Sequence, residues 1–328
     1  MNIYPPLFEN LYQSHPLTLV DVGAGGGILP HWKPHRRHLR VIGFEPDARV
    51  FDELSRQQDR MTRCLNIGLY NRSGAIPLYL TRKQQNSSCF LPNRTLLDRF
   101  HNPSRFDVLN ETTIQCRTLD EVLMEENLTD VDFIKLDTQG SELEILKGAT
   151  STLADAVFGL EIEVSFAEIY IGQPLFANID LFIKQYGFNL IDLRTISWKR
   201  SVGSSVGNSK GQLMHADALY LRRPKMLKDA LAKTDSSFAR TKLLRAFSVC
   251  QIYAFLDYGL ELLDRMGSGL FEESELQHLR SHIRSQASLA SKIPNIRGRK
   301  RLARMVMKLA KWLAPRKHRT AQRRLGNF

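Results

Sequence analysis

The sequence predicts an α/β protein built on a doubly wound, mostly parallel sheet, followed by a helical and basic extension. Three short apolar runs, at residues 17–22, 41–45 and 131–137, each carry an acidic residue at or next to their end, which is typical of buried parallel strands. Four glycines gather at residues 23–27, directly after the first run. In a doubly wound sheet this first strand-to-helix turn comes closest to the ligand, and glycine there lets the backbone approach it.

The segments after the glycines predict the next elements of the sheet. Pro30 and Pro34 allow only a short or broken helix between the first two strands. Residues 47–59 have the spacing of a surface helix. The segments on either side of the turn at Gly74 predict a strand and a hairpin arm that continue the sheet, at residues 64–70 and 75–80.

A long polar segment at residues 81–112 contains two prolines and predicts a functional loop or lid that carries a short helix. The loop is expected to sit over the pocket and to adapt to what binds there. The elements after it are expected to be a helix, a strand, a helix, a strand, a Gly- and Ser-rich loop and a last strand, at residues 141–153, 158–164, 175–186, 188–193, 201–211 and 216–221.

Charge divides the chain into three predicted domains. With 328 residues, of which 43% are apolar, the chain has room for one large domain and a smaller appendage. Residues 1–224 hold 24 basic and 26 acidic side chains, whereas residues 225–328 hold 22 basic and 8 acidic ones. We therefore expect a main domain at residues 1–224, a helical extension at 225–291 and a basic amphipathic tail at 292–328.

Cysteine usage and hydropathy favour a cytoplasmic protein. The four cysteines are widely spaced and form no C-x-x-C pair, so neither a disulfide framework nor a structural zinc site is expected. No apolar run reaches the roughly 18 residues that a membrane helix needs, and the first residues do not have the pattern of a signal peptide.

The glycine turn indicates which nucleotide-like ligand the pocket takes. The dinucleotide fingerprint G-x-G-x-x-G requires a sixth-position glycine where this chain has Ile28, which disfavours a nicotinamide cofactor. The pattern that fits is Asp21-x-Gly23-x-Gly25-x-Gly27. It resembles the first motif of Rossmann-like methyltransferases, whose glycines face S-adenosylmethionine and whose acid orients the methionine end. Glu45 ends the second strand, where a carboxylate accepts hydrogen bonds from ribose hydroxyls.

The segment DFIKLDTQGSELEILKGA at residues 132–149 resembles the FkbM family of methyltransferases, whose fourth strand reads approximately I-K-x-D-x-E-G-x-E and runs into L-K-G-A. Shorter segments fit the family in order, at residues 44–47, 118–123 and 216–223. The resemblance covers roughly residues 17–223. One departure is Gln139, which stands where the family commonly has Glu and removes a charge.

This resemblance implies a class I methyltransferase fold with a seven-stranded sheet, S-adenosylmethionine as cofactor, and methyl transfer to a hydroxyl on a sugar, glycan, lipid-linked or natural-product substrate. The residues expected to bind the cofactor are Asp21, Gly23, Gly25, Gly27, Glu45 and Asp137. An alternative interpretation, to which Gln139 points, is a cofactor-binding scaffold module that has lost its chemistry.

Methyl transfer to a hydroxyl needs a group that takes up the proton, because the sulfonium is already an activated donor. The candidates for this general base are Asp137, Glu142, Glu163 and His215. Each also has an ordinary structural explanation: Glu142 suits its helix N-terminus, for example, and a single loop histidine is more often structural than catalytic. No second cluster of oxygen ligands is evident, so no metal is predicted.

The tail at residues 292–328 predicts a basic amphipathic helix. Its apolar stripe contains Leu302, Val306, Leu309 and Leu313, with Met305 and Trp312 nearby. Three interpretations remain open: a solvated tail, a helix on an anionic membrane surface, and a nucleic-acid contact. Among the two binding interpretations we favour the membrane. The sequence Asp137-Thr138-Gln139-Gly140 contains no aromatic residue to stack on a flipped base, which disfavours base methylation but leaves RNA ribose methylation open. A homo-oligomer is also left open.

Overall fold

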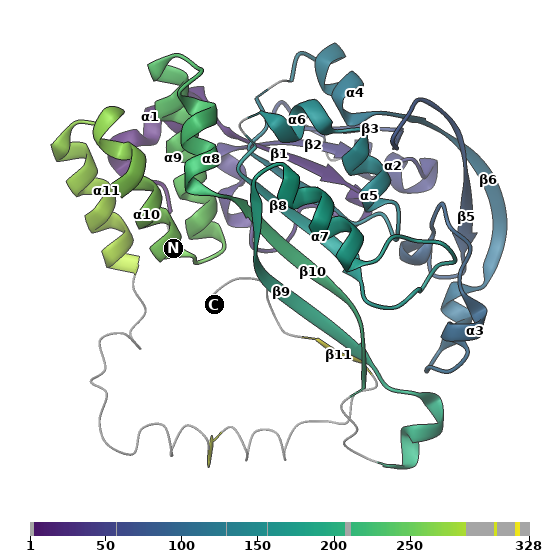
Figure 1. Cartoon of the computed structure of the whole chain (residues 1–328). Helices are drawn as coiled ribbons and strands as arrows, with labels where there is room; N and C mark the ends of the chain where they lie inside the picture. The colour runs from purple at the N-terminus through teal and green to yellow at the C-terminus, as the bar shows by residue number, and fades with distance from the viewer. Residues whose placement is uncertain are drawn as a thin grey trace.

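The computed structural model describes residues 3–56, 58–128, 130–155, 157–206, 211–286, 305–306 and 319–321. The described residues form one large sheet with the strand order β11-β9-β10-β8-β7-β1-β2-β3, flanked by helices on both faces (Figure 1). Its strands are β1 (Leu17–Val22), β2 (Leu39–Phe44), β3 (Thr62–Leu65), β7 (Phe133–Leu136), β8 (Gly159–Ser165), β9 (Phe188–Trp198), β10 (Gln212–Arg222) and β11 (Arg319–Ala321).

Strand direction confirms the predicted fold class. The pairs β1/β2, β2/β3, β1/β7 and β7/β8 are parallel, and β10 is antiparallel to both of its neighbours, β8 and β9. The order β3-β2-β1-β7-β8-β10-β9 with one reversed strand is that of the class I methyltransferase fold. The short strand β11 adds an eighth strand next to β9, which the sequence did not predict.

Alternating side chains of β1 enter two different cores, as expected for a strand covered on both faces. Val20 and Val22 pack with one set of helices, and Leu17 and Leu19 pack with the other. The helices of the first face are α4 (Leu119–Glu125), α5 (Glu142–Lys147), α6 (Thr150–Ala154) and α7 (Phe176–Gln185). α2 (Ala48–Ser55) begins after Asp47, whose side chain accepts a hydrogen bond from the Arg49 backbone N–H.

The second face of the sheet is covered mainly by helices from the end of the chain (Figure 1). They are α8 (Pro224–Leu231), α9 (Ser236–Ile252), α10 (Leu256–Met266) and α11 (Glu273–Gln286), joined by α1 (Glu9–Ser14). The β1–β2 connection contributes only 3₁₀ turns, η2 (Ala24–Gly26) and η3 (Lys33–His38), as its prolines predict. The predicted division of the chain into three domains stays a prediction.

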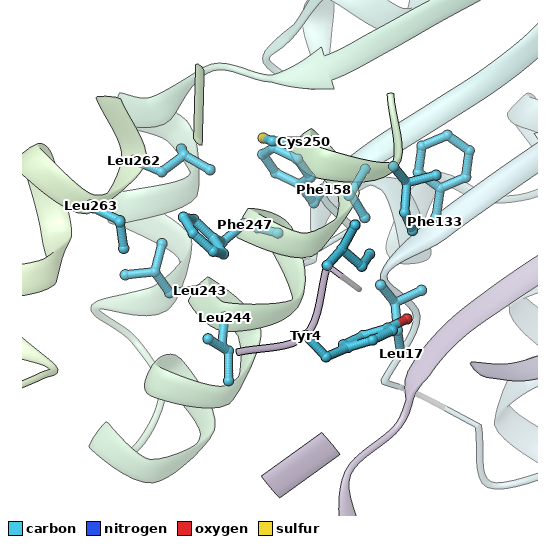
Figure 2. Close-up of a cluster of buried hydrophobic side chains, with 14 of the residues drawn as sticks. Tyr4, Leu17, Phe133, Phe158, Leu243, Leu244, Phe247, Cys250, Leu262 and Leu263 are labelled. Carbon is cyan, nitrogen blue, oxygen red and sulfur yellow. The ribbon is translucent and has the colours of Figure 1, made fainter. Parts of the chain in front are cut away.

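Helix α9 is buried along most of its length, which explains why its apolar residues recur too densely for a surface helix. Figure 2 shows part of this core, with residues of α9 and α10 beside residues of the N-terminal segment and of the sheet: Leu243, Leu244, Phe247, Cys250, Leu262 and Leu263 with Tyr4, Leu17, Phe133 and Phe158. Buried ion pairs fix the helix on the sheet, since Lys242 Nζ lies 2.7 Å from Asp132 Oδ1 at the start of β7.

The predicted hairpin around Gly74 is wrong. β4 (Gly68–Leu69) and β5 (Gly74–Thr81) do not pair with each other but lie on either side of β6 (Val108–Arg117), in a separate three-stranded sheet. Of the two segments predicted to continue the main sheet, only the first reaches it, through β3. The last residues of the segment predicted as a loop, 81–112, form the first half of β6. The residues of β6 are mostly exposed, so they do not show the apolar alternation that predicts a strand.

The helix predicted over residues 141–153 is divided into α5 and α6. A Cβ at Gly148 would overlap the carbonyl oxygen of Tyr70, so the chain approaches β4 there too closely for a side chain. The other strands and helices predicted up to residue 221 are present, and the loop at 81–112 contains the short helix α3 (Arg94–Leu97). Among the helices that the structure describes, none combines the length and the hydropathy of a membrane span.

Candidate functional site

The glycines after β1 serve two different purposes. Gly23 has φ +75°, and a Cβ on it would overlap the carbonyl oxygen of Asp137, which allows the ends of β1 and β7 to meet. A Cβ on Gly25 would lie 3.0 Å from Glu45 Oε2. Gly26 and Gly27, in contrast, have no atom within 4 Å of an added Cβ. Gly23 and Gly25 therefore make room for neighbouring protein atoms, the backbone of Asp137 and the side chain of Glu45, and the other two glycines keep space open.

That space is a cavity of about 310 Å³ at the carboxyl ends of β1, β2 and β7. Five of the six predicted cofactor residues line it: Gly23, Gly25, Gly27, Glu45 and Asp137. The segment at residues 81–112 contributes Gln84, Gln85, Ser87 and Cys89 to the wall. Burial raises the pKa of Glu45, although its Oε1 accepts a hydrogen bond from the Asp47 N–H at 3.0 Å.

The sixth predicted residue, Asp21, does not line the cavity but lies buried behind the glycine turn. Lys135 Nζ, on β7, lies 3.0 Å from Asp21 Oδ1 and donates a hydrogen bond to the Gly23 carbonyl oxygen at 3.0 Å. Burial raises the pKa of Asp21, an effect that Lys135 opposes. Burial lowers the pKa of Lys135, but Asp21 and Asp137 outweigh it and raise that pKa above its usual value. Lys135 therefore joins the first acid of the motif to the glycine turn.

Sequence reasoning did not single out Lys135, although it lines the cavity. A signal was present, because Lys135 is the charged residue within the otherwise apolar strand FIKL. A charge in a buried strand requires a partner, and the carboxylate at the end of the neighbouring strand provides it.

A second cavity, of about 180 Å³, adjoins the first. Gln85, Asp137 and Gln139 belong to the walls of both cavities. All four candidate bases line the smaller cavity: Asp137, Glu142, Glu163 and His215. They come from the residue after β7, the start of α5, β8 and β10, so the fold brings together residues that are up to 78 positions apart in the sequence.

His215 and Glu163 form a pair across β10 and β8. His215 Nδ1 lies 2.8 Å from Glu163 Oε1. Glu161, two residues earlier on β8, is buried, and its Oε2 accepts a hydrogen bond from the Tyr253 hydroxyl at 2.6 Å. A carboxylate on Nδ1 fixes the ring orientation and tautomer of a histidine, which prepares Nε2 to accept a proton.

Gln139 joins the two cavities through its side-chain amide. Its φ of +58° places it in the left-handed region, and its Nε2 donates hydrogen bonds to Asp137 Oδ1 at 2.9 Å and to Glu163 Oε2. Its Oε1 accepts a hydrogen bond from the Tyr170 hydroxyl at 3.1 Å. The amide thus separates two carboxylates, a task that a third carboxylate could fulfil only with a shared proton or a cation.

Both carboxylate oxygens of Glu142 accept hydrogen bonds from the turn before α5. Its Oε1 accepts from the Thr138 N–H at 2.7 Å and its Oε2 from the Gly140 N–H at 3.0 Å. Burial raises the pKa of Glu142 to about 7, and the charge of Glu163 adds to this effect. Its position matches the structural explanation considered for it, a carboxylate at the N-terminal end of a helix.

Within the described part of the chain, no group of three or more His, Cys, Asp and Glu side chains is arranged to hold a metal ion. Most of the predicted basic helix, and with it Leu302, Leu309, Trp312 and Leu313, lies outside the described residues. Met305 and Val306 are described and are exposed.

Comparison with known proteins assigns the chain to a family. Residues 21–190, more than half of the chain, match the family model described as the Methyltransferase FkbM domain. The chain belongs to the FkbM methyltransferase family. It is therefore a methyltransferase that depends on S-adenosylmethionine, as the glycine motif predicted.

Two curated methyltransferases are distant relatives of this chain. The chain is 25% identical over 168 residues to methyltransferase sdnD from Sordaria araneosa, a match that covers 44% of this chain and 65% of sdnD. It is 27% identical over 191 residues to the 2-O-methyltransferase NoeI from Sinorhizobium fredii, a match that covers 55% of this chain and 76% of NoeI.

Solved structures similar to this FkbM protein include magnesium protoporphyrin IX methyltransferase from Synechocystis with bound S-adenosylmethionine. It has 11% sequence identity and a TM-score of 0.33, and the match covers 63% of this chain and 71% of the other. A TehB-like methyltransferase from Corynebacterium glutamicum has 12% identity and a TM-score of 0.32, with 64% of this chain and 82% of the other covered.

Proposed function

We propose that the protein transfers the methyl group of S-adenosylmethionine to a hydroxyl of a sugar, glycan, lipid-linked or natural-product acceptor held in the smaller cavity. The observation that carries this proposal is the pair formed by His215 and Glu163, 2.8 Å apart, in a cavity that shares a wall with the glycine-lined one. The name of the relative NoeI, a 2-O-methyltransferase, supports oxygen as the accepting atom.

S-adenosylmethionine would occupy the larger cavity. Glu45 suits the ribose hydroxyls, because its carboxylate lies at the end of β2 and lines the cavity. Gly26 and Gly27 leave room for the cofactor beside the backbone. Asp21 acts indirectly in this proposal, by holding Lys135 against the glycine turn.

The cofactor supplies an electrophilic methyl group. The protein aligns the acceptor hydroxyl with that methyl group, excludes water from the site and provides a proton acceptor. His215 takes the hydroxyl proton on Nε2 while Glu163 stabilises the imidazolium through Nδ1. With S-adenosylmethionine bound in the larger cavity, the acceptor oxygen would take the methyl group as it gave its proton to His215, and the sulfur would keep the electrons of the bond to the methyl carbon. The products would be the methyl ether, S-adenosylhomocysteine and a proton held by His215.

Two measurements test this proposal. Calorimetric titration with S-adenosylmethionine, S-adenosylhomocysteine and NAD should give saturable binding of the first two and none of NAD. Incubation with methyl-tritiated S-adenosylmethionine and a panel of hydroxylated glycosides should then label at least one acceptor. Cofactor binding with no transfer to any acceptor would instead favour the scaffold interpretation.

We further propose that the protein is cytoplasmic and peripheral to an anionic membrane, through the 13 basic side chains of residues 292–328. Deletion of residues 292–328 should weaken sedimentation with phosphatidylserine vesicles, and added salt should weaken sedimentation of the intact chain. Equal sedimentation with and without the segment would refute this.

A further inference from the structure

We propose that the acceptor carries an anionic group, a carboxylate or a phosphate, which Arg105, Lys83 and Trp198 bind in the smaller cavity. This inference rests on the proposed function, because it concerns the substrate of the same site. All three residues line that cavity together with the His215–Glu163 pair.

The two cations are brought together by backbone pairing at the end of the small sheet. The Lys83 N–H donates a hydrogen bond to the Arg105 carbonyl oxygen at 3.0 Å, beyond the point where Thr81 pairs with Val108. The side chain of Asn86, which also lines the cavity, donates to the same carbonyl at 3.4 Å. Two positive charges 22 positions apart in the sequence thus lie at one wall of the cavity.

The guanidinium of Arg105 is held in place before any ligand binds. Its Nη1 donates a hydrogen bond to the His101 carbonyl oxygen at 2.9 Å. Its Cζ lies 4.6 Å from the ring centroid of Trp198 and 4.9 Å from that of Phe106. A planar guanidinium fixed by stacking loses little freedom on binding, and its fork of N–H donors fits the two oxygens of a carboxylate or phosphate.

Trp198 provides the second, independent observation. Its side chain is 6% exposed, and its Nε1–H has no hydrogen-bond partner among the described residues. An indole N–H can only donate, and a buried donor without a partner costs free energy. An oxygen of a ligand in the cavity would satisfy this donor.

The carboxylates of the cavity already have partners of their own. Asp137 accepts a hydrogen bond from Gln139, and Glu163 forms a pair with His215. Glu142 accepts hydrogen bonds from backbone N–H groups. Lys83 is exposed and makes no ion pair with any described carboxylate. Each carboxylate of the cavity therefore already has a hydrogen-bond or ion-pair partner, and Lys83 is available to pair with an anionic substrate.

The test uses the full chain, loaded with S-adenosylhomocysteine for binding or with tritiated S-adenosylmethionine for transfer. The probes are 4-nitrophenyl β-D-glucuronide against 4-nitrophenyl β-D-glucoside, and glucose 6-phosphate against glucose. Binding is followed by saturation-transfer NMR. We expect at least one charged probe to bind or react roughly 10-fold better than its neutral counterpart, the size of one charge-assisted hydrogen bond. The two pairs distinguish carboxylate from phosphate.

Arg105→Gln should weaken binding or transfer of the charged probes far more than that of the neutral probes, and so remove most of that preference. Lys83→Gln, at an exposed position, should reduce it and keeps the test valid if the first variant does not fold. Arg82→Gln is the matched control, because Arg82 lies beside Lys83 but pairs with Asp107 and does not line the cavity. Absence of any preference for the charged probes, or an equal loss for charged and neutral probes in Arg105→Gln, overturns the proposal. Preferential binding without transfer would preserve it and count against the proposed methylation instead.

Discussion

His215 Nδ1 lies 2.8 Å from Glu163 Oε1, although the two residues are not direct partners in the sheet. The register pairs His215 with Ser165 and Glu163 with Asp217, so the two side chains meet diagonally across antiparallel strands. Because both strands lie inside the sheet, with neighbours on each side, the geometry of the pair is fixed by the fold. In the proposed mechanism, the pair removes a proton without rearrangement of the site.

Replacement of His215 should separate catalysis from cofactor binding. His215→Gln is expected to lower kcat by roughly 10²- to 10⁴-fold, the usual contribution of a general base, while the Kd for S-adenosylmethionine stays unchanged. Steady-state kinetics on an acceptor found in the glycoside panel, together with calorimetry, measure both. His15→Gln, at an exposed histidine, is the control. A variant with full kcat would exclude His215 as the base.

Gln139 should set the pH range of activity. Gln139→Glu places a third carboxylate between Asp137 and Glu163 in place of the amide that now donates to both. The added negative charge favours protonated His215, so the acid limb of the pH–rate profile should move to higher pH. Gln185→Glu makes the same charge change at an exposed position of α7 and should not move it. An unmoved acid limb in Gln139→Glu would show that the amide does not act on the base.

Glu142 should make the folded state less stable as the pH rises towards neutrality. Its pKa is raised from 4.5 to about 7, so between these values the folded protein holds a proton that the unfolded chain releases. The stabilisation is complete below pH 4.5 and is lost as the pH passes 7, a change of about 3 kcal/mol.

Glu142→Gln cannot lose that proton. The free energy of unfolding of the variant, relative to the parent protein, should therefore rise by about 3 kcal/mol from pH 4.5 to pH 8 in urea titrations. Glu53→Gln, at an exposed carboxylate, should show no such trend. A constant difference across this range would mean that Glu142 is not the group that titrates.

The parts of the site that the sequence predicted are those encoded by local pattern. The spacing of Asp21, the glycines and Glu45 places them at the ends of adjacent parallel strands, and this requires only that the first two strands be neighbours. The contact of Asp21 with Lys135 was not predictable in the same way. Lys135 lies 114 positions later and reaches Asp21 because β7 pairs with β1.

Long-range packing also explains what the sequence did not predict about the fold. The helical spacing in α9 indicated burial but not the surface that covers it, because that surface is made by β1, β7 and the N-terminal segment. The strand β6 was not predicted because it is exposed rather than buried. Its exposed residues carry no apolar alternation, and only its partners β4 and β5 identify it as a strand.

Gly23 and Gly26 offer a comparison in which one added methyl group tests each purpose of the glycine turn. In Gly23→Ala the methyl would overlap the carbonyl oxygen of Asp137, and the φ of +75° would be strained for alanine. The free energy of unfolding should fall by about 3 kcal/mol, the sum of these two costs. In Gly26→Ala the methyl meets no atom within 4 Å, at a residue that lines the larger cavity. Stability should stay within about 0.5 kcal/mol of the parent protein, whereas the Kd for S-adenosylmethionine should rise roughly 10-fold.

Urea unfolding measures the stability of both glycine variants, and calorimetry measures their Kd for S-adenosylmethionine. If Gly26→Ala binds the cofactor as tightly as the parent protein, the cofactor does not approach the backbone at this glycine, and the larger cavity binds it elsewhere.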